Sequence, residues 1–353
     1  MSALLNAILK ESASSAVNGA FDELLRKQIN IEDGIRSKAS DSQNHLRDFL
    51  SSEYQNDQTF PSVLSVQDRD FLGGSFARHT KIWPLDDIDI YFPLDGYSLN
   101  YLQDGLRLPY TVVSDGVLSS NPLLTARWMS GSYISSRKLI SGLSAVLQRH
   151  YPRTDVRPDG EAVRIAMAHG ETEDEDGLGF DVVPCFLMRP DAISEAKFYL
   201  IPDGQDGWIR TNPKVDKEIA NKLHQNNARS YKKAIKILKF WNKEALNGAL
   251  QSYYVELAIA RRFLDSNSAG NYAAKVSEAV AFAFYAVNVA ISSGSLSSFV
   301  NQAPLVSPGD VSDHHRFIVN KMAGVARLAF EAEQVGNQDQ AIELWRQIFG
   351  ETF

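Results

Sequence analysis

The sequence predicts an α+β fold in which a mixed sheet with flanking helices forms one lobe and helices form a second lobe. Strand-like apolar runs and turn residues are confined to residues 58–213, whereas residues 1–57 and 214–353 space their apolar residues as helices do. Glycine and proline, which interrupt regular structure, are also concentrated before residue 214. We therefore expect the helices from both ends of the chain to pack together, with the active site in the cleft between them and the sheet.

Both ends of the chain are expected to be helical. Within residues 1–57, one segment follows helical spacing and a second amphipathic segment covers 35–50, and we expect 1–57 to pack with the helical lobe. The apolar positions of the first segment are Leu5, Ile8, Leu9, Phe21, Leu24 and Leu25. The same spacing predicts a helical C-terminal domain over 214–353, with helices at 214–247, 253–264, 273–291, 313–334 and 338–349.

The stretch 58–213 is expected to hold the sheet. The alternating run IDIYF at 88–92 predicts a strand, and so do the runs AVRIAMAH at 162–169 and GFDVVPCFLM at 179–188. Between them, residues near 136–150 follow helical spacing. This order of elements predicts a mixed sheet covered by at least one helix.

The segment FLGGSFARHTKIWPLDDIDIYF, residues 71–92, combines a glycine turn with two aspartates. Gly74 and Ser75 offer backbone N–H groups and a hydroxyl to a triphosphate. Asp87 and Asp89 lie two residues apart, so on a strand they project toward the same face. Two carboxylates aimed at one point are costly unless a cation lies between them. Either feature alone would indicate only a turn or a solvated strand end, but their order and separation favour a nucleotidyl-transfer site.

A third aspartate, Asp181, lies within the apolar run that predicts the strand at 179–188. Aspartate is rarely buried in such a strand unless it is paired or bound to a metal. Two acids on one strand and a third on a neighbouring strand match the ligand set of a two-metal site. We therefore predict Asp87, Asp89 and Asp181 as catalytic residues and as ligands of two Mg²⁺ ions, for which Mn²⁺ is an expected substitute.

The composition excludes several classes of protein. With 353 residues, 44% of them hydrophobic and 22% charged, the chain is an ordinary globular protein. Its net charge of −7 argues against an extended basic footprint for nucleic acid. The single cysteine, Cys185, excludes an internal disulfide framework and a cysteine-rich zinc site and fits a reducing cytoplasm. No stretch approaches the roughly 18 apolar residues of a membrane span, so we expect a cytoplasmic protein.

Over most of its length the chain resembles the cGAS/DncV-like nucleotidyltransferases, or CD-NTases, of bacterial anti-phage signalling. GGSFARHT followed by DDIDI is similar to the family's glycine-serine and first-metal signature, and FDVVPCF is similar to its third-carboxylate strand. GWIRTNP at 207–213, AIKILKFWN at 234–242 and SYYVELA at 252–258 follow in the family's order. The resemblance implies a polymerase-β-like nucleotidyltransferase core over 58–213 and an oligoadenylate-synthase-like helical lobe over 214–353.

The same resemblance implies further nucleotide contacts. Lys239 occupies the position of the family's triphosphate-binding lysine, and Gly74 and Ser75 would hold the triphosphate from the other side. Ser252 falls at a second phosphate contact, and Tyr253 falls where a ring stacks on the donor base. Without the resemblance, SYY indicates a helix start followed by core aromatic residues. A solvated basic face is the alternative for the lysine stripe of the preceding helix, which comprises Lys232, Lys236, Lys239 and Lys243.

Two pairs of residues near these motifs each have two interpretations. Thr211 and Asn212 either present a hydroxyl and an amide to a base edge, which makes Asn212 a nucleotide-binding residue, or form a pre-proline turn that caps the next helix. Arg78 and Thr80 either assist phosphate binding or fix the turn behind the glycines.

The resemblance implies synthesis of a cyclic di- or trinucleotide second messenger from NTPs (ATP, GTP or pyrimidine NTPs), with release of pyrophosphate, in CBASS anti-phage defence. It also implies regulatory protein partners and a downstream effector that responds to the product. The acidic net charge argues against an obligate nucleic-acid partner. Two alternatives stay open, a nucleotidyltransferase acting on RNA or protein and a non-catalytic nucleotide-binding module. Base specificity, linkage, ring size, activating signal and oligomeric state are not specified by the sequence.

Overall fold

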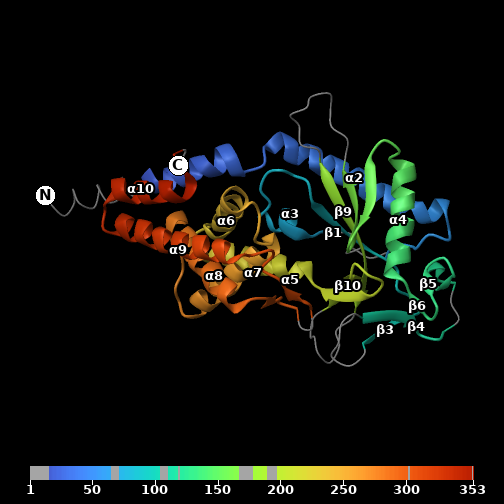
Figure 1. Ribbon diagram of the computed structural model, residues 1–353. Coiled ribbons are helices and arrows are strands. Elements are labelled where there is room, and N and C mark those ends of the chain that lie inside the picture. The colour runs from blue at the N-terminus through green and yellow to red at the C-terminus, as the bar shows by residue number, and fades with distance from the viewer. Residues whose placement is uncertain are drawn as a thin grey trace.

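The computed structural model describes residues 16–64, 71–103, 110–117, 120–166, 178–188, 197–300, 303–351 and 353. The chain forms a sheet lobe, in which a twisted sheet is covered by helices α2 and α4, and a helical lobe made of α5 to α10 (Figure 1). Each lobe has its own large hydrophobic core. The expected α+β fold, with a mixed sheet and a separate helical lobe, is confirmed.

Within the described residues the sheet has eleven strands. Its main path runs β1-β2-β9-β10-β11-β4-β6-β5, while β3 pairs with β4, and β8 joins β9 and carries β7. The bounds are β1 Phe71–Leu72, β2 Ile88–Pro93, β3 Leu99–Gln103, β4 Tyr110–Ser114, β5 Met129–Ser130, β6 Tyr133–Ile134, β7 Asp155–Asp159, β8 Ala162–Ala166, β9 Gly179–Met188, β10 Phe198–Pro202 and β11 Trp208–Thr211. All of the pairs are antiparallel except β2–β9, which is parallel.

The parallel pair β2–β9 brings two predicted site residues together. Its register places Asp89 directly opposite Asp181. On the other edge of β9, the antiparallel strand β8 places Arg164 opposite Asp181. Ile88 and Ile90 of β2 and Phe180, Val182 and Phe186 of β9 are buried in the core of the sheet lobe, as β-branched and aromatic residues of paired inner strands usually are. The strands predicted at 88–92 and 179–188 are therefore confirmed.

Helix α4 (Ser136–His150) matches the predicted helix. The hydroxyl of Ser135 caps it by accepting from the backbone N–H of Lys138. Leu139, Leu143 and Leu147 lie on its buried face and join the core of the sheet lobe. The cap and the leucine stripe are both local signals, which explains why the sequence identifies this helix.

The N-terminal residues divide between the two lobes. The π-helical turn η1 (Leu25–Ile29) and the helical residues before it pack into the core of the helical lobe, as expected for 1–57. Helix α2 (Asp33–Asn56) instead buries Ala39, Leu46 and Leu50 in the core of the sheet lobe, so the expectation is wrong for this segment. The chain becomes extended at Asn30, and α2 then lies along the sheet (Figure 1). Leu5, Ile8 and Leu9 lie outside the described residues.

The helical lobe is built around α8. Its helices are α5 Pro213–Asn226, α6 Tyr231–Leu246, α7 Ser252–Ser268, α8 Val276–Ser293, α9 Asp313–Gln334 and α10 Gln338–Phe349, with the small hairpin β12 Leu296–Ser297 and β13 Leu305–Val306. Contrary to the sequence analysis, α8 is long and apolar enough to cross a membrane. However, 61% of it is buried in the protein, where it packs against α6, α7 and α9 as the central helix of the core.

Two local expectations need correction. The helix predicted at 214–247 is broken into α5 and α6, because Ala228 and Arg229 have positive φ angles of 47° and 59°. No glycine or proline marks this break in the sequence. The glycine turn at 73–75 is the start of a short helix, α3 (Gly74–Arg78), which ends at His79 with a φ of 60°.

Candidate active site

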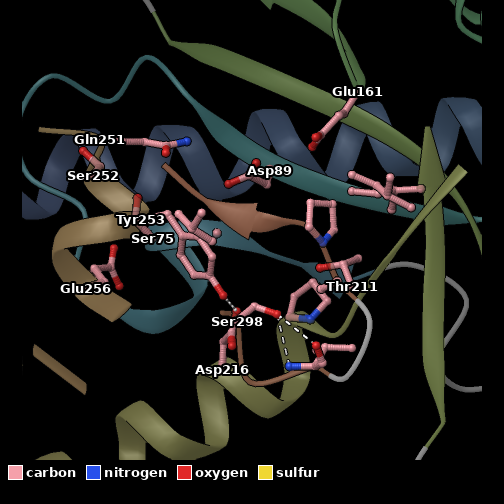
Figure 2. A pocket seen from close by; sticks show the side chains of 18 of the residues that line it. Ser75, Asp89, Glu161, Thr211, Asp216, Gln251, Ser252, Tyr253, Glu256 and Ser298 are labelled. Carbon is pink, nitrogen blue, oxygen red and sulfur yellow. Dashed lines mark hydrogen bonds between the residues drawn. The ribbon is translucent and has the colours of Figure 1, made fainter. Parts of the chain in front are cut away.

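A cavity of about 570 Å³ lies between the two lobes. Gly74, Ser75, Asp87 and Asp89 line it from the sheet lobe, and residues of α6 and α7 line it from the helical lobe. Figure 2 shows Asp89 and Glu161 facing the same space as Ser252, Tyr253 and Glu256. The hairpin β12–β13 and the residues around it close another side of the cavity. The cleft that the sequence predicts therefore contains most of the predicted site residues.

Asp87 and Asp89 line this cavity, and Asp181 lies opposite Asp89 on β9 without being among the lining residues. Burial, reinforced by the charges of Asp87 and Asp181, raises the pKa of Asp89 to about 7. Burial also raises the pKa of Asp181 to about 6, although Arg164 opposes this shift. Asp87 lies just before β2, and Asp89 follows two residues later on that strand. Ionisation of these carboxyl groups is costly in this arrangement, so a cation near them would be strongly favoured.

The carboxylate oxygens of the three aspartates are suitable ligands for a divalent cation. Oδ1 of Asp181 is buried and has no hydrogen-bond partner among the described residues. Asp87 is paired with Lys81, whose Nζ also lies 2.7 Å from Oδ1 of Asp86. As the side chains stand, no group of three His, Cys, Asp or Glu in the described residues is gathered closely enough to hold an ion. The aspartates supply hard oxygen donors and an unsatisfied buried acceptor, which suits Mg²⁺.

Two glycines allow the backbone at the start of α3 to approach the aspartates. Gly74 has a φ of 56°, and a Cβ at this position would collide with Oδ2 of Asp89. A Cβ on Gly73 would collide with the ring of Tyr91 on β2. The backbone N–H of Gly73 also donates to the carbonyl of Asp89 over 2.9 Å. The glycines thus hold Ser75 and its backbone directly beside the acidic cluster.

A buried ion network spans the cleft. Nε of Arg78 in α3 donates to Oε2 of Glu256 in α7 over 2.8 Å, and Thr80 donates to the same oxygen over 2.9 Å. Lys239 of α6 pairs with the other oxygen of Glu256. Burial alone would favour the neutral acid, but Arg78 and Lys239 lower the pKa of Glu256 to about 2. Arg78 and Thr80 therefore fix the segment behind the glycines, which is one of the two roles the sequence left open.

The aromatic residue at the cavity wall is also held in place. The hydroxyl of Tyr253 donates to Oδ2 of Asp216 in α5 over 2.9 Å (Figure 2). The guanidinium of Arg78 lies 5.5 Å from the centre of its ring. Ser252, the first residue of α7, is exposed at the cavity wall. The ring and this hydroxyl are thus presented together to the same space.

Asn212 does not face the cavity. Its Oδ1 accepts from the backbone N–H of Val215, which caps α5, and its Nδ2 donates to the carbonyl of Lys197 over 2.7 Å. The side chain is 7% exposed and is not among the residues that line the cavity, whereas Thr211 is. The prediction of Asn212 as a nucleotide-binding residue is therefore not supported, because the capping role uses its amide.

The comparisons with known proteins agree over nearly the whole chain, although no protein-family model matches it. A Bacillus cereus (strain VD146) protein named "Probable cyclic nucleotide synthase" is 26% identical over 360 residues, covering 95% of this chain and 97% of that protein. The resemblance of the chain to the CD-NTase family is thereby confirmed.

Solved structures of CdnC from E. coli MS115-1 share the fold. The structure of its complex with HORMA-deltaN gives a TM-score of 0.61 at 15% identity, and the structure with ATP gives 0.58 at 14%. Each match covers 95% of this chain and 98% of the CdnC chain. The chain is accordingly a nucleotidyltransferase, and its two-lobed fold matches that of CdnC over 95% of its length.

Several polar residues of the cavity are not identified by the sequence, among them Glu256, Asp216, Glu161 and Ser298. Glu256 and Asp216 lie within helices, where their charges alone indicate a solvated face. Glu161 stands in the turn between β7 and β8, and the burial of its carboxyl group together with Asp203 raises its pKa. Ser298 follows β12. Only Glu256 had a signal, since it belongs to the SYYVELA segment that supports the family resemblance.

Proposed function

We propose that this chain makes a cyclic di- or trinucleotide second messenger from NTPs and releases pyrophosphate. One observation carries the proposal: a single cavity receives Asp87, Asp89, Gly74 and Ser75 from one lobe and Lys239, Ser252 and Tyr253 from the other. The name of the Bacillus cereus relative supports the cyclic product. We retain 58–213 as the polymerase-β-like nucleotidyltransferase core and 214–353 as the helical domain.

The chain's own residues bind and orient the donor nucleotide. Backbone N–H groups at Gly74 and the Ser75 hydroxyl hold the triphosphate from the sheet lobe. Lys239, held by Glu256, contributes a positive charge from the helical lobe, and Ser252 contributes a hydroxyl. Tyr253, fixed by Asp216, offers its ring to the donor base. A ribose hydroxyl of the acceptor nucleotide attacks the donor α-phosphate in line, and pyrophosphate leaves.

Asp87, Asp89 and Asp181 would hold two Mg²⁺ ions, which lower the pKa of an attacking hydroxyl and neutralise charge on the departing pyrophosphate. The raised pKa values of Asp89 and Asp181 support this role, because they reflect burial and the charges of neighbouring aspartates, both of which a bound cation would offset. Repetition of the transfer on a linear intermediate in the same cavity closes the ring. The remaining wall, with Glu161, Thr211 and Ser298, is available to the acceptor nucleotide.

The biological setting follows from the family. We propose that the product is an anti-phage second messenger of the CBASS type, read by an effector in the cytoplasm. The complex of CdnC with HORMA-deltaN supports a regulatory protein partner for this chain as well. The net charge of −7 favours activation that does not depend on nucleic acid.

The decisive experiment incubates the purified protein with four NTPs and Mg²⁺, without DNA or RNA, and identifies the products by mass. We expect a cyclic oligonucleotide and an equivalent amount of pyrophosphate. Asp87→Asn together with Asp89→Asn should reduce product by orders of magnitude in a folded protein, because metal activation contributes several kcal/mol. A long linear polymer of nucleotides, or a nucleotide attached to the protein itself, would contradict the cyclic product, and the absence of pyrophosphate with any NTP would contradict catalysis.

A further inference from the structure

A second cavity, of about 440 Å³, lies behind the glycine helix α3. It shares no lining residue with the catalytic cavity. His79 at the end of α3 lines it, together with residues of 22–30 and residues from the junction of α5 and α6. The full set is Asp22, Leu25, Asn30, His79, His224, Arg229, Lys232, Lys233 and Lys236. Four cations and two imidazoles therefore converge on one hollow in an otherwise acidic chain.

Three of the four cations have no carboxylate partner among the described residues. Nζ of Lys232 donates to Oδ1 of Asn221 over 2.7 Å, and Nζ of Lys236 donates to Oδ1 of Asn30 over 2.8 Å. These partners are neutral amides, so the positive charges remain uncompensated. The acid in the lining, Asp22, is paired with Lys233 at 2.7 Å. Arg229 stands exposed on the left-handed turn between α5 and α6.

Burial and the crowding of positive charge lower the pKa values of basic groups in this cavity. Burial, Arg36 and Lys232 lower the pKa of Lys236 to about 8. Burial and the neighbouring cations, led by Lys232, lower the pKa of His224 to about 4. Nδ1 of His224 accepts from the backbone N–H of Lys232 over 3.3 Å, so the remaining proton of the neutral ring lies on Nε2. An anion in the cavity would relieve this repulsion.

We propose that this cavity is a second binding site, separate from the catalytic one, for a small polyphosphate anion. Pyrophosphate, tripolyphosphate or the phosphate chain of a nucleotide supplies several oxygens at short spacing. Lysine and arginine donors that converge on one hollow match such a compact ligand. A duplex backbone needs cations spread along a surface, whereas these lie within a single cavity. The site lies outside the machinery proposed for nucleotidyl transfer.

A titration of the full-length protein with pyrophosphate in EDTA tests the proposal. Histidine labelled with ¹³C at Cε1 reports on His79, which lines only this cavity, and a His79→Gln variant assigns its signal. Burial and the charges of Lys232, Arg36, Lys217 and Lys236 lower the pKa of His79. Bound pyrophosphate would compensate these charges, so we expect the pKa of His79 to rise in a saturable manner. A signal that does not respond would overturn the site.

Matched variants locate the binding. Arg229→Asn suits the left-handed backbone and removes one uncompensated charge, and Lys236→Gln removes another. We expect each to weaken pyrophosphate binding by about tenfold in calorimetry, the loss of one charge-assisted contact. Lys233→Gln, whose charge Asp22 already compensates, and the exposed Lys243→Gln should each change affinity by less than about twofold. Equal losses of pyrophosphate affinity in all four variants would contradict the assignment of the binding site to this cavity.

Two further arms identify the source of the phosphate. A nucleoside triphosphate that shifts the His79 signal at lower concentration than tripolyphosphate would support a nucleotide as the ligand, and the reverse order would support an inorganic chain. A short DNA duplex that competes tightly, with a steep dependence on salt, would overturn the small-anion proposal in favour of nucleic acid.

Discussion

Arg78 of α3 and Glu256 of α7 meet across the cleft, with Nε of the arginine 2.8 Å from Oε2 of the carboxylate. Both side chains are almost completely buried. The contact ties the glycine segment that faces the aspartates to the helix that carries Ser252 and Tyr253. Because Lys239 binds the same carboxylate, one glutamate holds groups from α3, α6 and α7 in a fixed relation.

Glu256→Gln should destabilise the protein and weaken NTP use. The substitution leaves the buried charges of Arg78 and Lys239 uncompensated, so the free energy of unfolding should fall by about 3–5 kcal/mol in urea denaturation. Glu244→Gln, on the exposed face of α6, is the control and should change it by less than about 0.5 kcal/mol. A Glu256→Gln protein with unchanged stability would show that the network contributes nothing to the packing of the lobes.

Lys239→Ala should impair NTP use far more than Lys243→Ala. Both residues lie on α6, but Lys239 lines the catalytic cavity whereas Lys243 is exposed. Loss of one charge-assisted phosphate contact should raise the apparent dissociation constant for NTP by about tenfold. The comparison is made at a temperature where calorimetry shows both variants folded. If the two variants bind NTP equally well, α6 does not contact the triphosphate.

Mg²⁺ should stabilise the protein more at pH 8 than at pH 5. The folded-state pKa values of Asp89 and Asp181, about 7 and about 6, lie above the usual 3.8. These groups therefore lower stability as pH rises from about 4 through 7, and their cost is largest once both are ionised. A cation offsets that cost, so the Mg²⁺-dependent rise in Tm should grow over this range.

Asp89→Asn isolates the contribution of one carboxylate. In EDTA at pH 8 the free energy of unfolding of the variant should exceed that of the wild type by about 1–2 kcal/mol. This value is smaller than the raised pKa of Asp89 alone would give, because solvent screening reduces the effect. The difference should vanish below about pH 3, where Asp89 is protonated in both the folded and the unfolded protein. A difference that does not change with pH would contradict the assigned repulsion.

Asn212→Ala should lower stability without changing NTP affinity. The substitution removes the cap of α5 and a hydrogen bond to Lys197, which together contribute about 1–2 kcal/mol. Because the amide does not line the cavity, the apparent NTP affinity should stay within about twofold of the wild type. Thr211→Val, at the neighbouring residue that does line it, serves as the comparison. A large loss of NTP affinity in Asn212→Ala would restore its predicted role in base recognition.

The parts of the fold that the sequence predicts correctly depend on local signals. The strand at 179–188 is a continuous apolar run, and α9 and α10 begin at capping residues Ser312 and Asn337. The break between α5 and α6 was missed because Ala228 and Arg229 adopt positive φ without a glycine to mark it. At this turn Oδ1 of Asn227 accepts from the backbone N–H of Ala273 over 2.8 Å, a long-range contact that a single sequence does not display.

The same distinction applies to the site. Asp89 and Asp181 stand out because acids in apolar strands are unusual, and Asp87 stands out because it lies two residues before Asp89. Glu256 does not stand out, since its partners Arg78 and Thr80 are far away in the sequence and come close only in the folded chain. Asn212 was assigned to the nucleotide because a cap and a base contact use the same amide, and sequence alone does not decide between them.

The parallel pairing of β2 with β9 also governs how the enzyme loses activity. Asp89 and Asp181 are neighbours only through this pairing, which joins segments distant in the chain. The acidic cluster therefore cannot survive in a partly unfolded molecule, nor form before the later strand has been synthesised and docked. Heat inactivation should then coincide with the cooperative melting of the whole sheet lobe. A nascent chain should have no activity until the core of the sheet lobe has formed.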